Sequence, residues 1–230
     1  MDNEKYVFSK NIHHVLIDNE FILFEDNEGL YILLDEKRSR DLLDIFSNKI
    51  SKNNSTTLNY LINNGIVTIF IHEQRLNHYR SEDLGVDNYE WRLNKNYQKQ
   101  KINALQYISA LFMLIKVKMC LSFFGLGFML KSLAQRKSRN KIPSARTKIN
   151  DSAAINYALR KVAPFMPFKT ECLEHSLALF QLLISREQTT TFNIGVQNYS
   201  FLAHAWVEID DVIIGDNLEL KQKLAIIYRL

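Results

Sequence analysis

The chain has 230 residues, of which 47% are hydrophobic and 11% aromatic, and its formal net charge is +4 at neutral pH. This composition suffices for a packed core and excludes a disordered polypeptide. Two cysteines, Cys120 and Cys172, are too few for a disulfide framework, and the acidic N-terminus lacks the apolar stretch of a signal peptide. We therefore expect a cytoplasmic protein.

Charge is distributed unevenly along the chain. Residues 1–50 hold 11 Asp and Glu against 6 Lys and Arg, whereas residues 91–150 hold 13 Lys and Arg and no acidic residue. The basic stretch is either a solvated face or a surface for an acidic partner, a membrane or nucleic acid. Because the sequence has no helix-turn-helix spacing, zinc knuckle or RNA-binding signature, we expect no nucleic-acid partner.

The first third of the chain predicts a small α/β unit. Asp35 is a candidate N-cap for one helix, and Gly65 is a candidate C′ residue at the end of another. The expected elements are strands at 13–18, 20–25, 29–34 and 66–71, and helices over 36–48 and from Ser55 or Thr56 to the residue before Gly65. This order suggests a winged-helix-like module over residues 1–75, followed by a polar linker over 76–100.

Residues 102–135 are the most apolar part of the chain. The sequence leaves a membrane span, a peripheral basic amphipathic helix and a buried helix pair as alternatives. Lys116 and Lys118 would each cost roughly 2.5–3.5 kcal/mol at the centre of a span. We therefore favour a buried helix pair broken near Phe124–Gly127, with Cys120 as a core residue and no stable membrane span.

Two helices are expected next. A basic loop over 136–150 precedes a helix over about 153–162, which two following prolines end. Thr170 is the predicted N-cap of a second helix, and this places Cys172 in the first helical turn. Unpaired N–H groups at a helix start favour a thiolate and can bind the oxyanion of a tetrahedral intermediate.

The last predicted elements are strands that bring a histidine towards an aspartate. The strands are expected at 191–197, 203–209 and 212–216. A two-residue loop at 210–211 would pair His204 with Asn217, whereas a three-residue bulged loop pairs His204 with Asp216. We therefore predict a bulged hairpin in which Asp211 has a positive φ.

A thiol, an imidazole and a carboxylate in this order are the parts of a cysteine hydrolase or acyl-transfer site. In this hypothesis His204 takes the proton from Cys172 and later protonates the leaving amine, while Asp216 fixes the imidazole tautomer. Each residue alone is more often a buried cysteine, a core histidine or a loop cap. His175 is a rival base without an orienting carboxylate, and a metal site of these four residues matches no common zinc spacing, so we expect no metal.

Several strings in this sequence resemble a known family. They are CLEHSLAL (172–179), FNIGV (192–196) and AHAWVEID…IIGD (203–216). Over roughly residues 105–220 they are similar to the transglutaminase-like leader peptidase of lasso-peptide B proteins. The upstream strings GLYILLDEKRSRDLLDIF (29–46) and LNYLINNGIV (58–67) resemble the precursor-recognition domain of such systems. The implied fold is α+β, with a transglutaminase/papain-like cysteine peptidase domain over residues 101–230.

The resemblance also implies roles for individual residues. Cys172 matches the family nucleophile, His204 its base and Asp216 its orienting acid, although Asp210–Asp211 stands where these proteins often have Asp-Gly. The leader is expected to bind as an added β-strand between an edge strand at 30–34 and a helix at about 56–64. The corresponding peptide-binding residues are Leu30, Tyr31, Ile32, Leu33, Leu58, Leu61 and Ile62.

The expected function is that of a cysteine endopeptidase that removes the leader of a ribosomally synthesised lasso-peptide precursor, a step of antibiotic biosynthesis. The family implies an ATP-dependent, asparagine-synthetase-like cyclase as partner, with the basic apolar stretch 102–148 as a docking surface. We expect no cofactor in this chain, because it has no nucleotide-binding fingerprint. The alternatives are an acyltransferase or transglutaminase with the same triad, and a non-catalytic peptide-binding adaptor.

Overall fold

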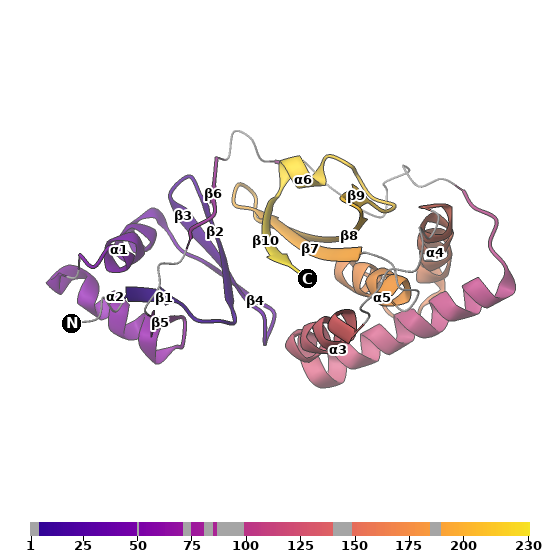
Figure 1. Ribbon diagram of the computed structural model, residues 1–230, viewed down its shortest axis with the longest axis horizontal. Coiled ribbons are helices and arrows are strands. Elements are labelled where there is room, and N and C mark those ends of the chain that lie inside the picture. Colours follow the sequence, from indigo (N-terminus) through magenta and orange to yellow (C-terminus); the bar gives the residue numbers. More distant parts are fainter. Residues whose placement is uncertain are drawn as a thin grey trace.

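A computed structural model describes residues 5–49, 51–70, 75–80, 85–86, 99–139, 149–184 and 190–230. Strands dominate the N-terminal part, whereas helices precede a second sheet in the C-terminal part (Figure 1). The expectation of an α+β chain is confirmed. The winged-helix-like character of the N-terminal module stays a prediction.

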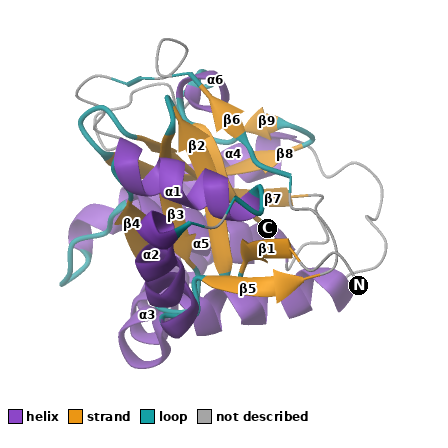
Figure 2. Ribbon diagram, turned by 90° about the vertical axis from the view of Figure 1, so that its left-hand side faces the viewer, coloured by secondary structure: helices purple, strands orange, loops and turns teal. Residues whose placement is uncertain are grey.

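The N-terminal module is built around a sheet with the strand order β4-β3-β2-β6. A separate two-stranded ribbon pairs β1 with β5, and α1 and α2 lie in front of β2 and β3 (Figure 2). The bounds are β1 (Lys5–Phe8), β2 (Ile12–Ile17), β3 (Glu20–Glu25), β4 (Leu30–Leu33), α1 (Glu36–Phe46), α2 (Lys52–Asn63), β5 (Val67–Phe70) and β6 (His78–Tyr79).

The predicted caps in this module are partly confirmed. The Asp35 side chain accepts a hydrogen bond from the Arg38 amide at the start of α1, and Gly65 follows α2 with a φ of 65°. The expected start of α2 was wrong, because Ser51 is the N-cap and completes a capping box with Asn54. The sequence also missed β1 and β6, and β6 lies within the predicted 76–100 linker.

Strands β2 and β3 bury both of their faces. Their alternating side chains divide between two cores, as a period of two requires. One set packs with α1 and α2, and the other set packs with the C-terminal part of the chain. The first set is Ile12, Leu16, Phe21 and Leu23, and the second is Val15, Ile17, Ile22 and Phe24. The N-terminal sheet is therefore one wall of the core that also contains the second sheet.

The C-terminal part has a sheet with the order β10-β7-β8-β9, and α5 packs on β7 and β8. Helix α3 packs on α4 and α5 and runs beneath this sheet in Figure 1. The bounds are α3 (Ala104–Arg139), α4 (Ile149–Val162), a 3-10 turn (Ala163–Phe165), α5 (Cys172–Ile184), β7 (Thr190–Gln197), β8 (Leu202–Ile209), β9 (Val212–Ile213), α6 (Leu220–Lys223) and β10 (Ala225–Arg229).

Helix α3 only partly agrees with the predicted buried helix pair. The predicted break is confirmed, because Gly125 has a φ of 77° inside the helix. The predicted burial was wrong for the outer face, whose large apolar side chains are exposed. These side chains are Leu105, Tyr107, Ile108, Phe112, Met119, Phe123, Phe124 and Phe128. By length and composition α3 could cross a membrane, but a single helix of this kind is weak evidence for a membrane span. Its inner face belongs to the core that contains α4 and α5.

Candidate active site

Cys172 is the first residue of α5 and is partly exposed. The predicted N-cap, Thr170, is off by one residue, because the Glu171 carbonyl accepts the first helical hydrogen bond from the His175 amide at 3.1 Å. The Glu174 carboxylate in turn accepts a hydrogen bond from the Glu171 amide at 3.0 Å. The first turn of α5, which carries the thiol, is therefore capped by the side chain of the third helical residue, Glu174.

Two contacts hold this helix start in place. Lys118 of α3 donates to the nearly buried Glu174 carboxylate at 2.8 Å. One turn beyond Cys172, the Ser176 hydroxyl donates to the Ala205 carbonyl of β8 at 2.8 Å. The sequence missed both contacts, because neither residue stands out by type or spacing. Together they fix α5 against the strand that carries the candidate base.

The imidazole of His204 and the carboxylate of Asp216 meet in the structure. The distance from His204 Nε2 to Asp216 Oδ2 is 2.8 Å, and the two side chains are 3% and 9% exposed. A buried hydrogen bond of this length with a charged partner is strong and orients the ring. The structure therefore brings together the second and third members of the predicted triad.

The route by which Asp216 reaches His204 differs from the prediction. The hairpin has a plain two-residue loop, with Ile209 paired to Val212 and positive φ at both Asp210 and Asp211. The bulged register was wrong, although the predicted positive φ of Asp211 is confirmed. Strand β9 instead ends early, so the regular pairing that would turn Asp216 away from His204 is not continued.

Gly215 makes the turn that presents Asp216. Its φ is 68°, and a β-carbon there would lie 1.9 Å from Asn156 Nδ2 of α4, so a side chain has no space. Arg160 of the same helix donates to the Gly215 carbonyl at 2.7 Å. The sequence could not show that α4 shapes this turn, because the two segments are 55 residues apart.

Cys172 lies close enough to His204 for its side chain to influence the pKa of the imidazole. Burial lowers the pKa of His204, but its hydrogen bonds to Asp216 and Cys172 outweigh this effect and raise the pKa to about 9. The ring is thus cationic at neutral pH and can protonate a leaving amine.

The rival base His175 lies on α5 and is buried. Burial, and to a lesser extent the charge of Arg160, lower the pKa of His175 to about 3, against the opposing effect of Asp216. A ring this weakly basic is a poor proton acceptor at neutral pH. Within the described residues, no group of three or more His, Cys, Asp or Glu side chains is arranged to hold a metal ion.

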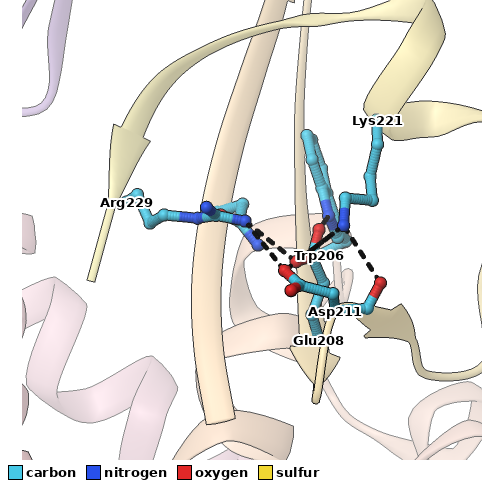
Figure 3. Close-up of polar contacts among 6 residues, drawn as sticks. Trp206, Glu208, Asp211, Lys221 and Arg229 are labelled. Atoms are coloured by element: carbon cyan, nitrogen blue, oxygen red, sulfur yellow. Dashed lines mark hydrogen bonds and ion pairs between the residues drawn. The ribbon is translucent and has the colours of Figure 1, made fainter.

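A second polar network lies on the face of β8 that carries His204. The Trp206 indole, stacked near the His204 ring, donates to Glu208 at 2.9 Å (Figure 3). Glu208 is fully buried and accepts from Arg229 of β10 at 3.0 Å, with Lys221 of α6 at 3.5 Å (Figure 3). These contacts anchor the strand beside the site.

The predicted peptide-binding residues fall into two groups. On β4, an edge strand of the N-terminal sheet, Leu30 and Leu33 are about half exposed and the two residues between them are partly buried. On α2, Leu58 and Leu61 are buried in the core of the module, so they are not available to a peptide, whereas Ile62 is exposed. The α2 part of the predicted contact set is thus wrong for two of its three residues.

Comparison with known proteins identifies a family to which the chain is similar. A family model of the transglutaminase-like superfamily matches residues 113–229, slightly more than half of the chain. The chain is also similar to the Microcin J25-processing protein McjB of Escherichia coli, with 38% identity over 60 residues. This match covers 26% of the chain and 29% of that relative, so it spans less than a third of either protein. No solved structure matches the chain.

Both comparisons support the resemblance to lasso-peptide biosynthesis B proteins. The range matched by the family model contains the thiol, the imidazole and the carboxylate described above, as well as the elements that position them. Because this range is more than half of its length, the chain belongs to the transglutaminase-like superfamily.

Proposed function

We propose that this chain is a cysteine peptidase that removes the leader of a ribosomally synthesised lasso-peptide precursor. The observation that carries the proposal is the buried contact of His204 with Asp216 at 2.8 Å, together with Cys172 at the start of α5, near enough to His204 to influence its pKa. The similarity to a relative named as a processing protein of microcin J25 supports the choice of substrate class.

The proposed reaction uses the three side chains in sequence. The Cys172 thiolate forms a bond to the scissile carbonyl carbon, and the π electron pair moves onto the oxygen. The C–N bond then breaks, and the leaving amine takes a proton from the His204 imidazolium, which Asp216 keeps oriented. Water, deprotonated by the neutral His204, then attacks the thioester carbonyl, the C–S bond breaks, and the carboxylic acid leaves while the Cys172 thiolate and the His204 imidazolium are restored.

Recognition of the leader is assigned to β4, the edge strand of the N-terminal sheet among the described strands. An edge strand offers unpaired backbone N–H and C=O groups, so an extended peptide can add to the sheet there. The exposed side chains of Leu30 and Leu33 would contact the peptide from this strand. Ile62 is the exposed member of the helical contact set, whereas Leu58 and Leu61 act by shaping the module core.

A cyclase partner is assigned to the outer face of α3. This face exposes large apolar side chains, and residues 91–150 carry 13 basic residues without an acidic one. An ATP-dependent, asparagine-synthetase-like cyclase with an acidic apolar patch would complement it. Replacing Phe112 and Phe123 with Ser should weaken cyclase binding, and unchanged affinity would remove this assignment.

The peptidase is tested with the purified chain and a precursor peptide, by following the mass of the products. Cys172→Ala should abolish cleavage and leave leader binding intact. Cys120→Ala is the matched control, because this second cysteine lies on α3 and burial raises its thiol pKa. Cleavage that persists in Cys172→Ala refutes the nucleophile, and cleavage lost in Cys120→Ala would point to a folding defect instead.

The same geometry also serves acyl transfer, because an amine can replace water in the attack on the thioester. Incorporation of an added primary amine into the product, with little hydrolysis, would favour an acyltransferase or transglutaminase. A non-catalytic adaptor is distinguished by thiol chemistry. If Cys172 resists alkylation at neutral pH although it is partly exposed, the chain binds a peptide without cleaving it.

A further inference from the structure

Trp206 lies beside the candidate base on the same face of β8. The rings of Trp206 and His204 are nearly parallel, with 13° between their planes and 6.4 Å between their centroids. Both residues are buried, at 1% and 3% exposure. The indole therefore flanks the imidazole in the interior of the protein, where its position decides how much space the imidazole has.

A missing side chain on β7 makes room for the indole. In the pairing of β7 with β8, Gly195 lies directly opposite His204. Directly opposite residues point to the same face of a sheet, so a side chain on Gly195 would lie against the imidazole. The indole occupies this space instead, because a β-carbon on Gly195 would lie 2.7 Å from both Cη2 and Cζ3 of Trp206. The imidazole thus has the indole as its neighbour across the strand.

A buried carboxylate holds the indole in this place. Trp206 Nε1 donates to Glu208 Oε1 at 2.9 Å (Figure 3). Glu208 is fully buried, and its Oε2 accepts from Arg229 at 3.0 Å. Arg229 is oriented in turn, because its Nε donates to Asn193 of β7 at 2.8 Å. Charge-assisted hydrogen bonds of this kind are strong, and a buried indole that turned away would leave its own N–H group unpaired.

We infer that Trp206 is a positioning residue for the imidazole of His204. Its ring fills the space beside the imidazole and keeps it in the orientation in which Nε2 donates to Asp216 Oδ2 at 2.8 Å. Trp206 neither makes nor breaks a bond in the reaction. It prevents the imidazole from turning and keeps water away from the buried hydrogen bond. The inference rests on the proposed peptidase function, and it names the side chain that holds the base of that reaction.

The test compares Trp206→Leu with Phe192→Leu. The first substitution opens the space beside the imidazole, whereas the second removes a fully buried ring that packs on Phe180 of α5, at the other face of β7. Trp206→Leu should lower kcat for precursor cleavage, counted per reactive Cys172 thiol, about 10²-fold, because a misplaced catalytic group is costly. KM should change less than about twofold. Phe192→Leu should lower the stability of the chain but keep kcat per thiol.

A second measurement needs no turnover. The proton that His204 Nε2 donates to Asp216 should exchange slowly with water, and it can be followed by NMR in a chain with isotope-labelled histidine. His204→Gln identifies this resonance by removing it. Trp206→Leu should speed the exchange at least about tenfold at neutral pH, because the hydrogen bond then opens more often. Phe192→Leu should leave the exchange slow, so a general loss of stability does not produce the same result.

The outcomes separate this inference from the proposed function. If Trp206→Leu keeps the kcat and the slow proton exchange of the unaltered chain, the inference is overturned and the peptidase stands. Equal changes in Phe192→Leu would also overturn it, because they would then come from a loosened fold. If Cys172→Ala still cleaves the precursor, the peptidase mechanism is lost, and the exchange measurement alone decides whether Trp206 holds the imidazole.

Trp206→Phe takes the place of Trp206→Leu if the leucine variant does not fold. Phenylalanine keeps an aromatic ring on this face of β8 but has no N–H group for Glu208 to accept. The kcat per thiol should therefore fall and the proton exchange should become faster, both by less than in the leucine variant. Unchanged values of both quantities would overturn the inference.

Discussion

The backbones of Gly127 and Asn27 are in direct contact. The Gly127 amide donates to the Asn27 carbonyl at 3.1 Å, and a β-carbon on Gly127 would lie 2.4 Å from the Asn27 α-carbon. Because only glycine allows this approach, the turn between β3 and β4 can sit directly on α3. This contact fixes the edge strand of the N-terminal sheet relative to the helix that supports the site.

Gly127→Ala should therefore destabilise the chain. Glycine to alanine inside an exposed helix stabilises by up to about 1 kcal/mol, so the sign of the effect is diagnostic. The clash with backbone atoms should instead lower the free energy of unfolding by about 1–3 kcal/mol, as measured by urea denaturation. Ser122→Ala, at an exposed site on α3, should show no loss. A stabilised Gly127→Ala chain would contradict the docking.

Lys118→Met should destabilise the start of α5. Glu174 is only 9% exposed, and the substitution removes the ammonium group that lies 2.8 Å from its carboxylate. An uncompensated, nearly buried charge costs up to about 3 kcal/mol, and urea denaturation measures this loss. Lys116→Met is the control, because Lys116 is exposed on the same helix. If both variants unfold at the same urea concentration, the Lys118–Glu174 ion pair does not contribute to the stability of the folded chain.

Asp216→Asn tests the orienting acid. The amide cannot hold the imidazolium, so kcat should fall by about two to four orders of magnitude. The pH profile gives a second readout. In the unaltered chain, activity should decline as pH rises through about 9, where the His204 imidazolium is lost. In Asp216→Asn this decline should begin at lower pH, and an unchanged profile would mean that Asp216 does not tune His204.

The order of Cys172, His204 and Asp216 on a helix and a hairpin predicted a triad, because each residue stands next to a strong local pattern. The structure brings His204 and Asp216 into contact, and the catalytic role of the three residues stays a prediction. The register of the hairpin was wrong, because the premature end of β9 depends on Gly215 and its contact with Asn156 of α4. Contacts between distant segments leave no local signal.

The same limit explains the errors elsewhere. An apolar run in a sequence does not say which of its faces meets a neighbour, so the exposure of Phe123 on α3 could not be foreseen. Leu58 and Leu61 have the spacing of one helix face, which fits a peptide groove or a core, and the structure shows the core. Tyr31 was expected as a leader contact, and its packing against Phe201, next to β8, depends on the docking of the two parts.

Two buried histidines make the stability of this chain sensitive to acid. Burial lowers the pKa of His14 to about 4 and that of His175 to about 3, from 6.5. Between these values and 6.5 the unfolded chain binds protons that the folded chain does not, so stability falls as pH falls through this range. Denaturation midpoints measured between pH 7 and pH 4 should therefore decrease.

His175→Gln should make stability less dependent on pH, because the glutamine takes up no proton in the unfolded state. The slope is the readout, since the charges of Arg160, Asp216 and His204 around this position can shift the absolute stability in either direction. Ser122→Ala, which removes no titratable group, is the control and should keep the original slope. If stability falls with pH as steeply in His175→Gln as in the unaltered chain, His175 already binds its proton in the folded protein. His175 would then compete with His204 as the base of the site.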